Sequence, residues 1–269
     1  MSVLAAEPRS IRLSAPKWRL RTGRWLSPAL LLVLWELGSR TGVIPTRVLA
    51  APSVVAQTLW SMIVSGELAS NLAVSLARAA AGLAIGLVVG VALALVAGLS
   101  RRGETGVDPL MQLGRTLPSL ALTPLFIVWF GIGETPKITL IAVATVFPIY
   151  LNLFAGIRGV DAKLIEAARS FGLSGWQLIV HAILPGALPS FLVGLRYALG
   201  VAVLVLVVAE QINASAGLGY LINNARDFMR TDVIVVCLLV YATLGLSADL
   251  IVRALEARAL AWRTSFLKS

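Results

Sequence analysis

Three ionisable side chains lie inside or at the ends of long apolar segments of this sequence: Arg78, Arg196 and Glu210. A charge within a membrane is costly, so such a side chain faces protein or water and is a candidate for function. The guanidinium of Arg196 could hold an anion through two parallel hydrogen bonds. Alternatively, it could pair with a carboxylate or carbonyl, or extend to the cytoplasmic interface. Glu210 would repel an anion, which favours gating or contact with an external protein, and Arg78 is expected at the outer interface.

The elements that carry these charges are predicted to be membrane-spanning helices. The chain has 269 residues, 58% of them hydrophobic and 13% charged, with a mean hydropathy of +0.88, which is atypical of a water-soluble globule. Its apolar runs approach the ~20 residues that cross a bilayer as a helix. The predicted spans are 26–38 (extended toward Ile44), 79–99, 116–133, 138–157, 188–209 and 233–248. We therefore expect an all-α polytopic membrane bundle with six transmembrane helices.

The distribution of Lys and Arg predicts the orientation of this bundle, because cytoplasmic segments of membrane proteins are enriched in both. Most of the 23 basic residues lie in the N-terminal arm, after the second and fourth spans, and in the tail. Arg101, Arg102 and Arg115 are assigned to the cytoplasmic loop after the second span. Both termini are therefore expected in the cytoplasm. The net charge of +10 then reflects topology and contact with membrane lipids rather than binding of nucleic acid.

Small residues and prolines mark two of the predicted spans. A stripe of small residues allows another helix to approach closely, either within the chain or from a second copy. In the second span this stripe comprises Gly82, Gly86, Gly90, Ala94 and Gly98. Pro118 and Pro124 interrupt the third span, and such breaks are tolerated where the backbone is buried or lines a pathway. Both prolines are therefore candidates for a pathway through the membrane.

A short charged segment, 158–187, separates the fourth and fifth spans on the predicted cytoplasmic side. One helix face is predicted to be apolar, because its members recur at helical spacing. That face comprises Val160, Leu164, Ala167, Ala168 and Phe171. The segment is expected to form a short helix, a sharp turn and a second helix, either as an interfacial anchor or as a docking element for a partner.

The ends of these two short helices carry capping signals. Asp161 can cap the first helix, and Gly172 suits the left-handed position just past its end. Ser174, with Gln177 three residues later, predicts a capping box for the second helix. That helix is expected to stop ahead of Pro185.

The order of residues in this segment resembles the signature loop of the permease subunits of bacterial ABC importers. That loop reads Glu-Ala-Ala, three residues, Gly, nine residues, then Ile-x-Leu-Pro. Here the matching residues are Glu166, Ala167, Ala168, Gly172, Leu184 and Pro185, with Ala182 in place of the isoleucine. The resemblance implies that the loop is a coupling helix that sits in a groove of a cytoplasmic ATPase. Ala182 has less bulk than isoleucine, which should weaken packing rather than abolish docking.

The resemblance extends over nearly the whole chain and is strongest to the aliphatic-sulfonate, taurine and nitrate branch, above all to the aliphatic-sulfonate permeases. It rests on segments such as Trp129–Glu134, Leu184–Pro189, Gly217–Tyr220 and Asn224–Phe228. It implies a type I importer transmembrane domain at residues 26–255, after a basic arm (1–25) and before a tail (256–269). Arg196, Pro118 and Pro124 would belong to the substrate pathway, and Glu210 to gating or to contact with the binding protein.

The same resemblance implies the partners of the chain. They are two copies of an ATP-binding-cassette ATPase, a periplasmic or extracellular substrate-binding protein and a second permease copy, with a homodimer expected, in the bacterial inner membrane. The sequence contains no phosphate-binding Gly-x-x-x-x-Gly-Lys-Ser/Thr loop, so ATP and Mg are assigned to the ATPase. This chain is expected to bind no cofactor or metal and to hold no catalytic residue. The residues do not separate sulfonates from taurine, nitrate or other small anions.

Two other classes of function share features with this sequence. A secondary transporter driven by an ion gradient would use acidic residues within the membrane, and Glu210 alone gives it little support. An intramembrane serine hydrolase would need Ser215 and His181 within hydrogen-bond reach, yet the predicted topology places them on opposite sides of the membrane. The second class is therefore rejected.

Overall fold

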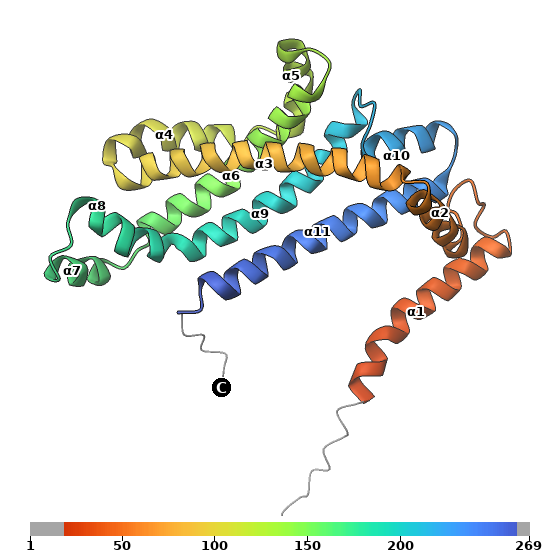
Figure 1. The fold of residues 1–269 in the computed structure, drawn as a ribbon, viewed down its shortest axis with the longest axis horizontal. Helices are drawn as coiled ribbons and strands as arrows, with labels where there is room; N and C mark the ends of the chain where they lie inside the picture. The colour runs from red at the N-terminus through yellow and green to blue at the C-terminus, as the bar shows by residue number, and fades with distance from the viewer. Residues whose placement is uncertain (1–18, 263–269) are drawn as a thin grey trace, which may run out of the picture.

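A computed structural model describes residues 19–262, and this part of the chain consists of helices and their connections (Figure 1). The α-helices are α1 (Arg19–Arg40), α2 (Pro52–Val64), α3 (Glu67–Leu99), α4 (Arg101–Gly114), α5 (Thr123–Phe130), α6 (Glu134–Arg158), α7 (Ala162–Ser170), α8 (Gly175–Leu178), α9 (Leu184–Gln211), α10 (Leu218–Asp227) and α11 (Thr231–Ala259). A 3₁₀-helix, η1 (Ser119–Leu122), precedes α5, and a π-helix, η2 (Ile179–Ile183), joins α8 to α9. The expected all-α fold is confirmed.

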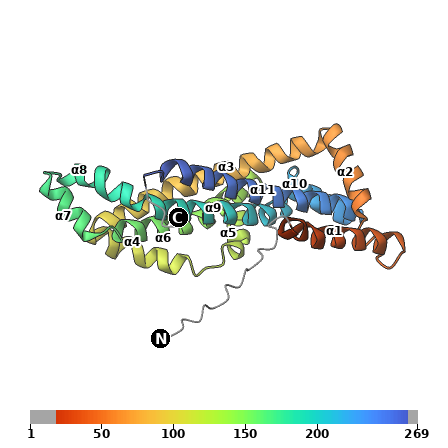
Figure 2. The same ribbon diagram turned by 90° about the horizontal axis from the view of Figure 1, so that it is seen from below.

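Four long apolar helices form the body of the molecule. α3, α6, α9 and α11 lie side by side, and α6 is the most buried of them (Figures 1 and 2). Each is long and apolar enough to cross a membrane, with α9 continued backwards through η2 and α8 to Gly175. They contain the predicted spans 79–99, 138–157, 188–209 and 233–248. The segment α7–α8 lies at one end of the bundle, and α2 and α10 lie at the other (Figure 1).

The predicted third span, 116–133, is wrong as a single helix. Its place is taken by α4 followed by η1 and α5, two apolar pieces that meet at an angle of 87° and count as one broken span at most. The described residues therefore supply four helices that could span a membrane, or five with this bent pair. α1 holds the predicted first span but is not among them. The count of six spans and the cytoplasmic termini stay predictions.

The small-residue stripe of α3 packs against α6. A Cβ atom added at Gly82 would lie 2.6 Å from Ile141, one at Gly86 would lie 2.0 Å from Thr145 Oγ1, and one at Gly90 would lie 3.0 Å from Ile149. Real Cβ atoms do not approach other atoms so closely, so these positions of α3 require glycine. The backbone of α3 therefore packs directly against side chains of α6 along the stripe. Of the two roles left open by the sequence, the stripe serves packing within the chain.

This contact predicts that Gly86→Ala destabilises the bundle although alanine favours helix. Overpacking of a well-packed contact costs about 1–3 kcal/mol, against about 1 kcal/mol gained from helix propensity. Gly200→Ala is the matched control, because nothing lies within 4 Å of a Cβ at that position of α9. We expect a lower thermal unfolding midpoint in detergent for Gly86→Ala alone. Equal midpoints for the two variants would contradict the α3–α6 contact.

α1 is connected to the rest of the described chain through Glu36. Its carboxylate accepts hydrogen bonds from the backbone N–H of Ser53 (3.0 Å) and the hydroxyl of Ser53 (2.7 Å), at the first turn of α2. This contact explains the acidic residue in the apolar helix α1, because a carboxylate stabilises unpaired N–H groups at a helix start. Most of the predicted arm (1–25) and half of the predicted tail (256–269) lie outside residues 19–262, and their predicted limits fall within α1 and α11.

Candidate functional site

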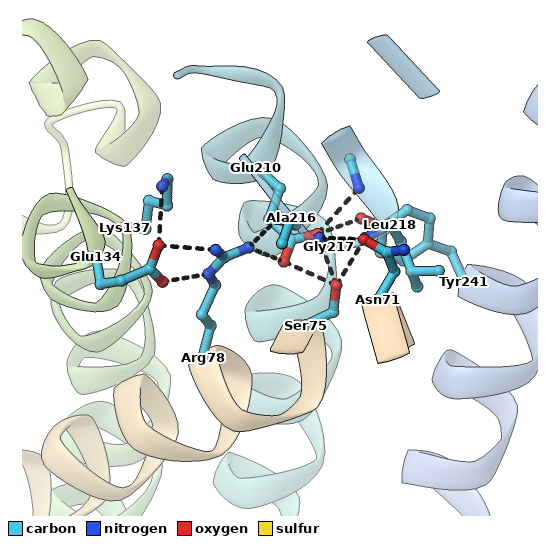
Figure 3. A network of polar contacts seen from close by, with 11 residues as sticks. Asn71, Ser75, Arg78, Glu134, Lys137, Glu210, Ala216, Gly217, Leu218 and Tyr241 are labelled. Carbon is cyan, nitrogen blue, oxygen red and sulfur yellow. Dashed lines mark hydrogen bonds and ion pairs between the residues drawn. The ribbon is translucent and has the colours of Figure 1, made fainter. Parts of the chain in front are cut away.

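A buried polar network joins α3, α6, α9, α10 and α11 (Figure 3). Arg78 of α3 lies at its centre and is 3% exposed. Its Nη1 donates to Glu210 Oε1 of α9 at 2.7 Å and to the carbonyl of Ala216 at 2.7 Å, while its Nε and Nη2 both donate to the carboxylate of Glu134. Lys137 donates to the same carboxylate at 3.2 Å.

Both carboxylate oxygens of Glu210 are satisfied. The side chain is fully buried and accepts hydrogen bonds from Ser75 Oγ (2.7 and 2.8 Å), Tyr241 OH (3.1 Å) and the backbone N–H of Gly219 (3.0 Å). Buried charges are tolerated only with such complete pairing. The network therefore fixes five helices relative to one another.

Arg78, which was expected at the outer interface, is buried inside the bundle in the structure. A guanidinium with two carboxylate partners inside the bundle has no need to extend to the lipid–water boundary, because its charge is neutralised where it lies. Glu210 was singled out from the sequence, whereas its partners Ser75 and Tyr241, and the second carboxylate around Arg78, Glu134, were not. One signal was available: Asn71, Ser75 and Arg78 recur at i, i+4 and i+7, so they share one polar face of α3.

The second candidate site is the segment that resembles a coupling loop. Asp161 caps α7 by accepting from the N–H of Lys163 at 2.9 Å, and Gly172 has a positive φ of 83°, as the sequence predicted. Ser174 makes no side-chain cap, so the predicted capping box is wrong. The chain turns between α7 and α8 while Glu166 and Ala167 stay exposed.

The helix after this turn does not end before Pro185. It continues through η2 into α9, and the N–H of Leu184 donates to the carbonyl of Ile179, five residues back. The wider π turn lets a proline enter a continuing helix, because it shifts the carbonyl that the ring would otherwise meet. Leu184 and Pro185 therefore anchor the segment to the membrane helix that carries Arg196 and Glu210.

The inward face of α7 also differs from the predicted one. Ala168 is buried in a small cluster with Leu178 and Ala182, with Ile165 packed against it. Leu164 and Phe171 point outward instead, and Phe171 is 87% exposed. Trp176 of α8 is 72% exposed. The small side chain of Ala182 fits the tight contact with α7. Two large aromatic side chains, Phe171 and Trp176, are left exposed at this end of the bundle.

The predicted pathway residues lie in two places. Pro118 immediately precedes η1 and Pro124 lies in the first turn of α5, so both belong to the bend of the broken span. Arg196 lies elsewhere, between α9 and α11, where its Nη2 donates to Glu256 Oε2 at 2.5 Å and its Nε lies 3.4 Å from Asp249 Oδ1. The carboxylate pairing foreseen as an alternative for Arg196 is what the structure shows, and its charge is neutralised in this conformation.

Comparison with known proteins places the chain among transport proteins. Residues 82–260 match the family model described as "Binding-protein-dependent transport system inner membrane component". A putative aliphatic sulfonates transport permease protein of Escherichia coli strain K12 is 48% identical over 93% of this chain and 95% of its own length. A protein of the same description from Bacillus subtilis strain 168 is 44% identical over 90% and 87%. The taurine transport system permease protein of Escherichia coli is 36% identical over 97% and 98%.

Solved structures share the fold at lower identity. A chain from the crystal structure of an amino acid ABC transporter with histidines aligns with a TM-score of 0.61 and 20% identity, over 74% of this chain and 98% of that one. A chain of the inward-facing MetNI methionine ABC transporter aligns with a TM-score of 0.53, 20% identity, and coverage of 67% and 92%. The fold is thus that of a type I importer transmembrane domain. The helical bundle, the family match and the near full-length relatives together show that this chain belongs to the binding-protein-dependent inner membrane components, the permease subunits of ABC importers.

Proposed function

We propose that this chain forms the translocation pathway of an importer for aliphatic sulfonates. The observation that supports this substrate class is the 48% and 44% identity, over nearly the full length, to two proteins described as aliphatic sulfonates permeases. The taurine permease, at 36% identity, belongs to a system for a molecule that is itself a sulfonate. Taurine, nitrate and other small anions are the alternative substrates within the same class of importer.

Coupling to the ATPase is assigned to the loop Glu166–Gly172. Its residue order matches the permease signature, and its turn leaves Phe171 and Trp176 exposed at the end of the bundle. Large aromatic side chains of this kind are typical anchors of protein–protein contacts. We assign two ATPase copies, which bind ATP and Mg, and a second permease copy to the assembled importer. The chain itself acts as a transport subunit without catalytic residues.

Contact with the substrate-binding protein is assigned to the opposite end of the bundle. A cavity of about 530 Å³ lies there between α2, α10 and the start of α11. Its lining includes Ser61, Glu67, Asn224 and Arg230, and the adjacent Phe228 and Met229 are each 73% exposed. The buried Glu210 offers no surface to such a partner in this conformation, so the proposed role for its carboxylate is gating.

The proposal is tested by reconstituting the chain with its ATPase and binding protein in proteoliposomes. We expect uptake of radiolabelled ethanesulfonate that requires ATP and the binding protein, with slower uptake of taurine and none of nitrate. Uptake that continues without ATP under an imposed ion gradient would instead indicate a secondary transporter. Faster uptake of taurine or nitrate than of ethanesulfonate would show that another anion is the preferred substrate.

A further inference from the structure

Arg115 lies at the middle depth of the bundle rather than in a cytoplasmic loop. It directly follows α4, whose last residue, Gly114, packs so closely on the Phe147 ring that an added Cβ would lie 2.9 Å from it. Phe147 is near the middle of α6, which runs from Glu134 to Arg158 and could span a membrane. At 1.5 Å per residue, this level is roughly 20 Å from one end of α6 and roughly 16 Å from the other.

By its spacing, Arg115 falls on the side of α4 that is turned toward α6, with its side chain exposed. Glu104, Asp108, Met111 and Arg115 recur at i, i+4, i+7 and i+11, which places them along one side of a helix. Glu104 pairs with Arg158, and Asp108 accepts a hydrogen bond from Tyr150 OH at 3.0 Å. Met111 is buried in the apolar cluster that contains Tyr150. The opposite side of α4 carries the exposed Leu110 and Leu113.

The charge of Arg115 is not neutralised within residues 19–262, where no carboxylate lies within 4 Å of its guanidinium nitrogens. Arg115 is exposed, whereas three other arginines on the long helices are paired: Arg78 with two glutamates, Arg158 with Glu104, and Arg196 with Asp249 and Glu256. A free guanidinium at the middle of a membrane is costly unless it faces water or binds an anion.

The break in the span leaves this side chain uncovered. α4 ends at Gly114, and the following residues Thr116, Leu117 and Pro118 are exposed up to the start of η1. No further helical turn therefore covers Arg115. A guanidinium presents parallel N–H groups that match two oxygens of one anionic group, which suits the headgroup of a sulfonate.

We propose that Arg115 binds the anionic headgroup of the substrate halfway along the translocation pathway. The substrate class rests on the proposed function; the position and the free charge rest on the structure. The sequence suggested this anion-binding role for Arg196, but the Arg196 guanidinium is already paired with two carboxylates on α11. We therefore assign the role to Arg115.

The test compares Arg115→Ala, Arg115→Lys and Arg102→Ala in the complete importer reconstituted with its ATPase and binding protein. Arg102 is an exposed arginine in the first turn of the same helix and is the matched control. With ethanesulfonate as the probe, we expect Arg115→Ala to lower uptake per ATP hydrolysed by about 10- to 100-fold, the loss typical of a charge-assisted hydrogen bond. Arg115→Lys should retain only part of the uptake, because it keeps the charge but loses the parallel pair of N–H groups, and Arg102→Ala should match the parent.

A second measurement tests whether position 115 is exposed to a water-filled pathway, and it does not require that a substrate be transported. Cys237 is the only cysteine of the chain and is buried, so Arg115→Cys introduces a single reactive thiol. We expect a membrane-impermeant thiol reagent to label it, since only a water-filled pathway gives such a reagent access at this depth. Ethanesulfonate should slow the labelling.

The outcomes separate this inference from the proposed function. If the parent importer does not take up ethanesulfonate, the substrate assignment fails, and an unlabelled Arg115→Cys would in addition overturn the placement of Arg115. If the parent transports and Arg115→Ala transports equally well, Arg115 is not a binding residue. Loss of the permease dimer or of the bound ATPase in Arg115→Ala would show an ion pair with the second copy and would also overturn the inference.

Discussion

Gly172→Val is expected to abolish ATP-driven uptake while the chain still inserts into the membrane at its normal level. Gly172 has a φ of +83°, a conformation that a β-branched residue adopts only under strain, at about 1–2 kcal/mol or more. Nothing lies within 4 Å of a Cβ at this position, so the substitution acts on the backbone of the turn and not on the packing of the core. The turn would reorganise and displace Phe171 and Glu166 from the positions that the ATPase is proposed to contact.

Glu166→Lys tests the same contact without touching the backbone. It reverses an exposed charge in the middle of α7, and we expect it to release or uncouple the ATPase as well. Both variants are measured for uptake, for ATP hydrolysis stimulated by the binding protein, and for copurification of the ATPase subunit.

The matched control for the backbone strain is Gly42→Val. Gly42 lies in the connection between α1 and α2, with a φ of +77° and nothing within 4 Å of an added Cβ. The strain is the same but the position is far from α7, so uptake should be retained. Normal coupled uptake by Gly172→Val and Glu166→Lys together would rule out the Glu166–Gly172 loop as the coupling element.

Removal of the buried carboxylate in Glu210→Ala is expected to cost about 3–5 kcal/mol of stability, the penalty usual for breaking a buried ion pair. The substitution leaves the Ser75 and Tyr241 hydroxyls and the Gly219 N–H without their acceptor, and removes one of the two carboxylates around Arg78. We expect low levels of folded chain in the membrane and a strongly lowered unfolding midpoint in detergent.

Glu134→Ala is the control, because it removes the other carboxylate partner of the same arginine. The Glu134 side chain is 53% exposed, so solvent can replace its contacts and the expected loss is smaller. The double variant Arg78→Met with Glu210→Met should lose less than the sum of the two single losses, because no unpaired charge is then buried. An unchanged unfolding midpoint in Glu210→Ala would show that the network does not hold the five helices together.

The gating role proposed for Glu210 can be tested separately from its structural role by comparing ATP hydrolysis with uptake. Glu210→Gln keeps the shape of the side chain and part of its hydrogen bonding while removing the charge. If Glu210 acts in gating, this variant should assemble with the ATPase yet hydrolyse ATP with little uptake. If uptake falls only in proportion to the amount of assembled complex, Glu210 is structural alone.

The sequence by itself determined the helical class, the membrane location, the family and most of the long helices. Hydropathy is a local property, so uninterrupted apolar runs such as those within α6 and α11 are found from composition and length alone. The turn at Gly172 and the cap at Asp161 were also predicted, because both depend on residues within one helical turn of each other.

Only the tertiary structure decided the features that depend on distant partners. Arg78 is buried because its carboxylate partners come from positions 56 and 132 residues further along the chain. α4 packs beside α6, despite its charges, because Glu104 and Asp108 find partners on α6. The helix continues past Pro185 because the π turn of η2 accommodates the ring. In each case the cost of a polar or helix-breaking residue is offset by a contact in three dimensions, which no local pattern of residues contains.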